Sequence, residues 1–105
     1  MAVDIDRVSQ IAEAAINSSP NLLVVWYLLA SYAYYKRDKP IISDGLYDTI
    51  CFLLMEELDA INIDHPHAYL CDPVALQAGT AYHIKDYPSI VVSTAERFID
   101  GRFPV

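Results

Sequence analysis

The sequence predicts a mainly α fold: a compact three-helix bundle with a loop-rich C-terminal third and a short terminal helix. Its 105 residues suffice for one domain and are too few for two. With 54% hydrophobic and 20% charged residues, the chain is too apolar to be disordered. Apolar side chains recur at helical spacing over residues 1–60, and that spacing weakens afterwards. We therefore expect a single domain over 1–105, with a helical core over 1–60 and a loop-rich tail with a short helix over 61–105.

The first two helices are indicated by apolar spacing and by the residues at their ends. Asp4 and Asp6 lie near the start of the first helix, expected over residues 3–17, where negative charge suits the helix dipole. Ser19 is expected to cap a second helix that runs from Pro20 to about Arg37, because proline is favoured at the first helical position. The second helix is apolar nearly all round, so it should form the centre of the core.

Later elements have weaker signals. Ser43 and Asp44 begin a third helix, which we expect to reach about Ala60 with one apolar face. After it we predict a short helical turn over Val74–Ala78 and an extended segment or short strand over Ser89–Val92. A last helix is expected over 95–99, capped by Ser93-Thr94 and closed by Gly101.

Charge and cysteine content limit the classes of partner and compartment. Seven basic against fourteen acidic residues give a formal charge of −7, which opposes direct nucleic-acid binding and favours a basic protein partner. Cys51 and Cys71 are too few for a disulfide framework, and Asp4 and Asp6 interrupt any apolar signal segment. The longest apolar stretch, Leu22–Tyr35, is shorter than the roughly 18 residues of a membrane span. We expect a cytoplasmic protein with free thiols and no membrane association.

One stretch in the middle of the chain carries a recognisable motif. A Tyr34-Tyr35 pair ends the second helix, and after Pro40 the pattern Asp44-x-x-Tyr47-Asp48 opens the third. This arrangement resembles the N-terminal Ia domain of bacterial NAD-dependent DNA ligases. The resemblance is clear up to about residue 58 and continues weakly, through His-Pro and Asp-Pro pairs, to residue 79.

The resemblance implies a small helical module that closes over an adenylation domain and holds the nicotinamide mononucleotide half of NAD. It assigns the ligand contacts to Tyr34, Tyr35, Asp44, Tyr47 and Asp48. The chemistry of these residue types agrees. Residues three and four apart share a helix face. Aromatic rings attract a cationic nicotinamide ring, and carboxylates accept hydrogen bonds from ribose hydroxyls.

The departures from the family define the function that we expect. The ligases carry an adenylation lysine in a Lys-x-Asp-Gly motif, whereas the chain's Asp100-Gly101 follows Phe98-Ile99. The resemblance therefore implies a stand-alone module that binds nicotinamide mononucleotide or NAD without being an enzyme by itself. It could serve as a subunit of a split NAD-dependent DNA ligase, with an adenylation domain as its partner.

The alternative is a small acidic interaction protein that docks on and modulates another protein. Such a protein could be virus-encoded and act in the host cell on a host or viral protein. Its charge of −7 would steer it toward basic surfaces. The two hypotheses differ in a structural detail. Convergence of Tyr34, Asp44, Tyr47 and Asp48 on one open cleft favours the ligand module, whereas buried tyrosines and scattered acids favour the interaction protein.

Each candidate residue also has a purely structural interpretation. Asp44 could simply stabilise a helix start, Tyr47 could pack on the second helix, and Asp48 could be solvated. One residue of the Tyr34-Tyr35 pair should be buried and the other partly exposed. No nucleophile and base can be paired, so no catalytic residue is predicted. A loose zinc-ligand set carries no recognised metal spacing, so no metal site is predicted either: His65, His67, Cys71 and His83.

Overall fold

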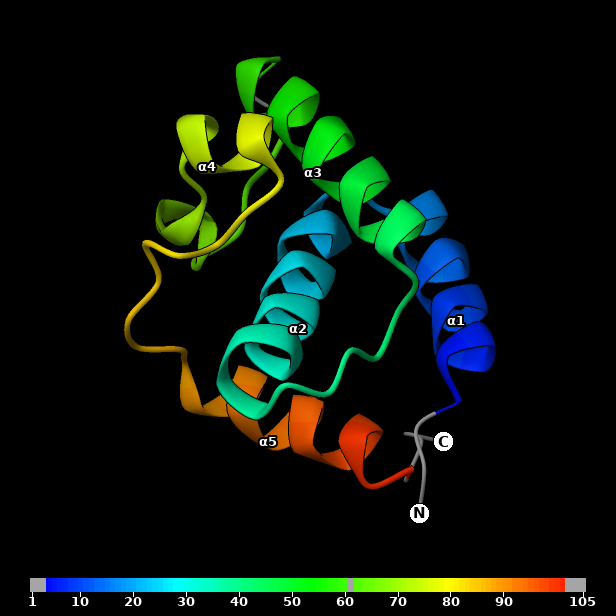
Figure 1. Ribbon diagram of the computed structural model, residues 1–105. Helices are drawn as coiled ribbons and strands as arrows, with labels where there is room; N and C mark the ends of the chain where they lie inside the picture. The colour runs from blue at the N-terminus through cyan, green and yellow to red at the C-terminus, as the bar shows by residue number, and fades with distance from the viewer. Residues whose placement is uncertain (1–3, 61, 102–105) are drawn as a thin grey trace.

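The computed structural model describes residues 4–60 and 62–101, which are helices joined by loops (Figure 1). Within those ranges there is no β-strand, and the mainly α prediction is confirmed. The elements, in chain order, are α1 (Ile5–Ser18), α2 (Asn21–Arg37), α3 (Asp44–Asp59), the 3₁₀ turn η1 (Ala68–Leu70), α4 (Pro73–Ala78) and α5 (Ser89–Ile99).

Helix α2 is the centre of the fold. It lies in the middle of Figure 1, and α1, α3 and α5 each pack against it. Nine of its side chains are buried, on every side of the helix, as expected from its uniformly apolar sequence. Because three helices enclose α2, its C-terminal turn is held in a fixed place beside the start of α3.

Polar side chains fix the starts of α1 and α3 at the residues that the sequence indicated. Asp4 accepts a hydrogen bond from the Arg7 amide at 3.0 Å, and Ser43 accepts one from the Leu46 amide at 3.2 Å. The Ser43 amide in turn donates to Ser9 Oγ at 3.0 Å, which ties the start of α3 to α1. The second helix begins one residue later than predicted, at Asn21. Its N-cap residue is therefore Pro20, which has no side-chain cap hydrogen bond, and the prediction of Ser19 as the N-cap is wrong.

The segment after Pro88 corrects the sequence prediction. Residues 89–92 are neither extended nor a strand, because they form the first turn of α5, and the predicted Ser93-Thr94 cap lies inside that helix. Three β-branched residues in a row suggest a strand by local preference. Burial of Val91, Ala95 and Phe98 on one face against α2 outweighs that preference. The last helix therefore has eleven residues, longer than the short one predicted, and the C-terminal third is less loop-rich.

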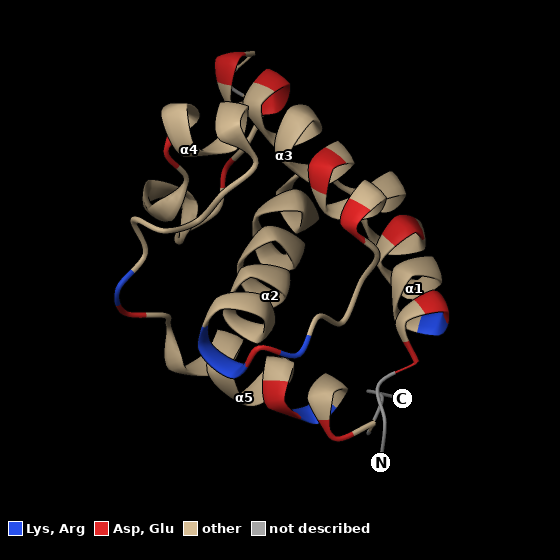
Figure 2. Cartoon of the chain, viewed as in Figure 1, with Lys and Arg blue, Asp and Glu red and all other residues tan. Residues whose placement is uncertain are grey.

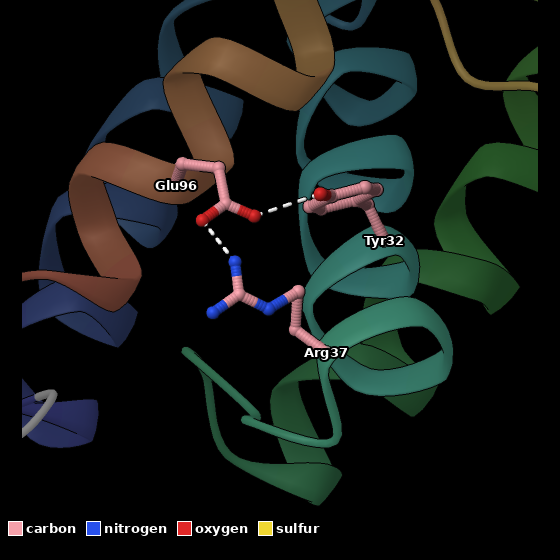
Figure 3. Close-up of polar contacts among 3 residues, drawn as sticks. All are labelled: Tyr32, Arg37 and Glu96. Atoms are coloured by element: carbon pink, nitrogen blue, oxygen red, sulfur yellow. Dashed lines mark hydrogen bonds and ion pairs between the residues drawn. The ribbon is translucent and has the colours of Figure 1, made fainter.

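A polar cluster joins α5 to the C-terminal end of α2 (Figure 3). Glu96 accepts a hydrogen bond from the Tyr32 hydroxyl at 2.7 Å and forms an ion pair with Arg37. The hydrogen bonds from Arg37 and Tyr32 lower the pKa of Glu96 below its ordinary value. This cluster holds the end of α2 in place from the side opposite α3.

The short helix α4 forms where the sequence predicted a helical turn. Asp72 caps it, and Gly79 ends it in the left-handed conformation with φ of 69°. Helix α4 packs against α3.

None of the described helices has the length and apolar character that a membrane crossing requires.

Candidate functional site

A pocket of about 310 Å³ lies at the C-terminal end of α2, beside the start of α3. Ala30 and the link between the two helices, at Pro40, Ile41 and Ile42, line part of it. The pocket is lined by all five residues that the sequence analysis selected: Tyr34, Tyr35, Asp44, Tyr47 and Asp48. The segment after α4 contributes further lining residues, Gly79 and Tyr82.

Three tyrosine rings form one wall of the pocket. The rings of Tyr34 and Tyr35 meet edge to face, with centroids 4.9 Å apart, and Tyr82 lies at the same distance on Tyr35. Tyr34 is 50% exposed and Tyr82 is 70% exposed, whereas Tyr35 is half-buried. Of the predicted pair, Tyr34 is the partly exposed member and Tyr35 the more buried one, although not fully buried. Burial, and then the nearby Tyr82, raises the pKa of Tyr35.

Tyr47 offers its ring to the pocket while its hydroxyl is engaged elsewhere. That hydroxyl shares a hydrogen bond of 2.8 Å with Ser31 Oγ on α2, and the ring stacks on Tyr27 with centroids 5.9 Å apart. Burial raises the pKa of both Tyr47 and Tyr27, so both phenols stay neutral at physiological pH. Tyr47 therefore packs on α2, as its structural interpretation predicted, and also lines the pocket.

Asp44 and Asp48 lie one turn apart on α3, and both are exposed. Within the described ranges no Lys or Arg joins them among the residues that line the pocket. Helix α3 carries five acidic residues and no basic one, and Figure 2 shows red along α1 and α3. The pocket is therefore an aromatic hollow with two carboxylates at its edge, suited to hydrogen-bond donors and to positive charge.

Gly79 brings backbone close to the acidic side of the pocket. A Cβ built on this residue would lie 3.3 Å from Asp48 Oδ1, and its φ of 69° strains any residue other than glycine. The sequence analysis noted Gly79 only as the end of a weak resemblance. The sequence signals for α4 were Asp72-Pro73 at its start and a glycine, Gly79, at its end. Tyr82 had no local signal, because only the tertiary fold brings it to Tyr35.

The histidine and cysteine set does not form a site. His83 Nε2 donates to the Leu70 carbonyl at 2.6 Å, and the His67 amide donates to His65 Nδ1 at 3.1 Å. Across residues 4–60 and 62–101, no three His, Cys, Asp or Glu side chains are grouped as a metal site requires. Cys51 is buried, and burial raises its pKa to about 11, as befits an inert thiol.

Part of the chain matches a known protein family. Residues 28–73 match the DNA ligase-like, N-terminal NAD+-binding domain. The predicted resemblance to the ligase Ia domain is thereby confirmed over 46 of the 105 residues, from α2 to the first residue of α4. The matched segment contains all five predicted pocket residues and ends before Gly79 and Tyr82. Searches of curated proteins and of solved structures gave no match.

Proposed function

We propose that this ligase-like, NAD+-related module binds NAD+ through its nicotinamide mononucleotide half, in the pocket between α2 and α3. The observation that carries the proposal is the convergence of Tyr34, Tyr35, Asp44, Tyr47 and Asp48 on one open hollow. The sequence analysis named the convergence of four of these residues, all except Tyr35, as the feature that distinguishes a ligand module from an acidic interaction protein.

The dimensions and chemistry of the pocket support the same ligand. A volume of about 310 Å³ lies at the lower end of the range for small-molecule sites, and suits half of a dinucleotide better than the whole. The exposed rings of Tyr34 and Tyr82 supply aromatic edges and faces for a flat cationic ring. The carboxylates of Asp44 and Asp48 are available to accept hydrogen bonds from ribose hydroxyls.

We further propose that the module does not catalyse a reaction by itself. Its 105 residues contain no Lys-x-Asp-Gly motif, so the adenylation lysine would come from another domain. In that arrangement the module holds the nicotinamide mononucleotide leaving group in line with the reacting phosphate. Such positioning contributes several kcal/mol to catalysis in other systems, on the order of 7–11 at most. A subunit of a split NAD-dependent DNA ligase is the form of this function that we favour.

Calorimetric titration of the protein with nicotinamide mononucleotide and with NAD+ tests the proposal. We expect heat of binding with both ligands and its loss in Asp44→Ala. Asp59→Ala is the matched control, since Asp59 is an exposed acid of the same helix that does not line the pocket. Absence of heat at millimolar ligand would remove the proposal, and equal loss in both variants would show that general charge, not the pocket, is responsible.

The C-terminal end of α3 supports a second candidate function, that of an acidic interaction protein. Glu56, Glu57 and Asp59 lie together there, and Phe52 is 57% exposed on the preceding turns. If calorimetry with both ligands is silent, a basic protein partner becomes the better explanation. Binding of that partner should then be lost in Glu56→Gln/Asp59→Asn and retained in Asp44→Asn.

A further inference from the structure

A second pocket, of about 250 Å³, lies beside the middle of α2. Helices α2 and α5 contribute most of its lining, and the loop between α3 and η1 contributes the rest. The apolar residues from the two helices are Val25, Leu28, Leu29, Ile90 and Val91. No residue lines both this pocket and the one beside the start of α3, so the two are separate.

Hydrogen bonds hold the loop of the second pocket in place. The Asp64 amide donates to Asn21 Oδ1 at 2.7 Å, which attaches the loop to the start of α2. The Ala68 amide donates to the His65 carbonyl at 3.0 Å. His65 and His67, two members of the set that forms no metal site, are thereby fixed beside α2 and α5. The second pocket is therefore largely preformed, as ligand sites usually are.

The polar groups of the second pocket favour a ligand with a hydrogen-bond acceptor. The His67 amide donates to His65 Nδ1 at 3.1 Å, so the neutral His65 ring carries its proton on Nε2 and can donate from there. His67 Nδ1 is buried without a hydrogen-bond partner among the described residues. Since buried polar atoms are nearly always paired, this one indicates a partner from outside the described chain.

The second pocket also favours a ligand without charge. No charged side chain is among the described residues that line it. Burial, and then the neighbouring His67, lower the pKa of His65, so its ring is neutral at physiological pH. The first turn of α5, which has no side-chain cap, adds backbone amides as further donors. A cation would meet donors and an anion would meet no counter-ion, whereas an uncharged acceptor is satisfied by one donor.

We propose that the second pocket binds a small uncharged molecule with an apolar body and one hydrogen-bond acceptor, as in an aryl ketone. The apolar side chains of α2 and α5 contact the body, and the Nε2–H of His65 donates to the acceptor. A volume of about 250 Å³ is below the roughly 300–1,000 Å³ of most ligand sites, which limits the occupant to about one substituted ring. This inference does not depend on the proposed function, because the two pockets share no residue.

Nuclear magnetic resonance titrations of the whole chain with three probes test the inference. Acetophenone carries a carbonyl acceptor, ethylbenzene has nearly the same shape without one, and benzoate carries a charge. We expect acetophenone to shift the methyl resonances of Leu28, Ile90 and Val91. It should bind about three- to tenfold more tightly than ethylbenzene, since one hydrogen bond is worth about that ratio. Benzoate should bind more weakly than acetophenone, because no counter-ion compensates for its lost hydration.

Two pairs of variants assign the binding to the second pocket. His65→Asn retains an acceptor for the His67 amide but lacks the Nε2–H, so the advantage of acetophenone over ethylbenzene should fall toward equality. His83→Gln, which replaces a histidine outside the lining, should keep that advantage. Thr94→Phe places a ring in the lining and should abolish binding of both probes, whereas Ser93→Phe, at an exposed position outside it, should not. Circular dichroism verifies that each variant is folded.

Four results would overturn the inference. Equal affinities for acetophenone and ethylbenzene in the wild type contradict the hydrogen bond from His65. Tighter binding of benzoate than of acetophenone identifies an anion site instead. Unchanged binding in Thr94→Phe places the probes elsewhere, and no binding of acetophenone at millimolar concentration removes the site altogether. The titrations with nicotinamide mononucleotide and NAD+ concern the other pocket, so the proposed function stands or fails separately.

Discussion

The hydroxyl of Tyr27 donates a hydrogen bond to the carbonyl oxygen of Thr80 at 2.7 Å, across 53 positions of the chain. Tyr27 is fully buried on α2, and Thr80 lies directly after Gly79. The bond attaches the segment that carries Gly79 and Tyr82 to the central helix. Since the same ring stacks on Tyr47, Tyr27 supports two sides of the pocket without lining it.

The first prediction concerns this bond. Tyr27→Phe removes the donor and leaves the Thr80 carbonyl without that partner, so the free energy of unfolding should fall by about 1–2 kcal/mol. Ligand affinity should also fall, because Tyr82 is no longer held against Tyr35. Urea denaturation and calorimetry measure the two effects. Tyr69→Phe, at a site 76% exposed, is the control and should change neither.

The second prediction concerns the glycine that faces Asp48. Gly79→Ala places a methyl group at a positive φ and 3.3 Å from Asp48 Oδ1, so we expect a loss of about 1 kcal/mol in stability or more. Gly45→Ala is the matched control, because a Cβ there meets nothing within 4 Å. In helix α3 that control should be neutral or stabilising by up to about 1 kcal/mol. Equal effects of the two substitutions in thermal unfolding would contradict the role given to Gly79.

The third prediction is a dependence of stability on pH through Glu96. Hydrogen bonds from Arg37 and Tyr32 lower its pKa in the folded state from the ordinary 4.5. A lowered folded pKa means that the contribution to stability is full above about pH 4.5 and is lost as the pH falls through the folded value. Glu96→Gln should therefore be less stable than the wild type at pH 7, and the gap should close in more acidic solution. A gap that stays constant between pH 7 and pH 3 in urea titrations would exclude this linkage.

The fourth prediction concerns the turn between α2 and α3. Asp38 ends α2 with φ of 51°, a conformation in which non-glycine residues are strained. Asp38→Gly should raise the free energy of unfolding by roughly 0.5–1 kcal/mol, whereas Asp38→Ala should lower it. Chemical denaturation of both variants gives the comparison, and a loss of stability in Asp38→Gly as well as in Asp38→Ala would show instead that the aspartate side chain stabilises the turn.

The parts of the fold that the sequence predicted well are those specified by neighbouring residues. Ser43 caps α3 through an amide only three positions away, and the acids of the pocket follow from that helix start by spacing. The prediction for the first half of α5 was wrong because the local preference of its β-branched residues for a strand is outweighed by burial against α2. Its position depends on a face of α2 that lies more than fifty residues earlier, which a local pattern does not contain.

The same reason explains what was found and missed at the pocket. Tyr34, Asp44, Tyr47 and Asp48 come from the ends of two consecutive helices joined by a short link, so their proximity could be inferred. Tyr82 meets Tyr35 only because the chain after α4 is anchored to Tyr27. Whether the five predicted residues bind a ligand stays a prediction until titrations are made.

The position of Tyr82 matters for anyone who chooses domain boundaries from the family match. A fragment that ends at residue 73, where the family match stops, would retain all five residues of the motif but would lack Tyr82, whose ring packs on Tyr35. It would also expose the face of α2 that α5 covers. Any excision or fusion of this module should therefore keep the chain at least through the helix that ends at Ile99.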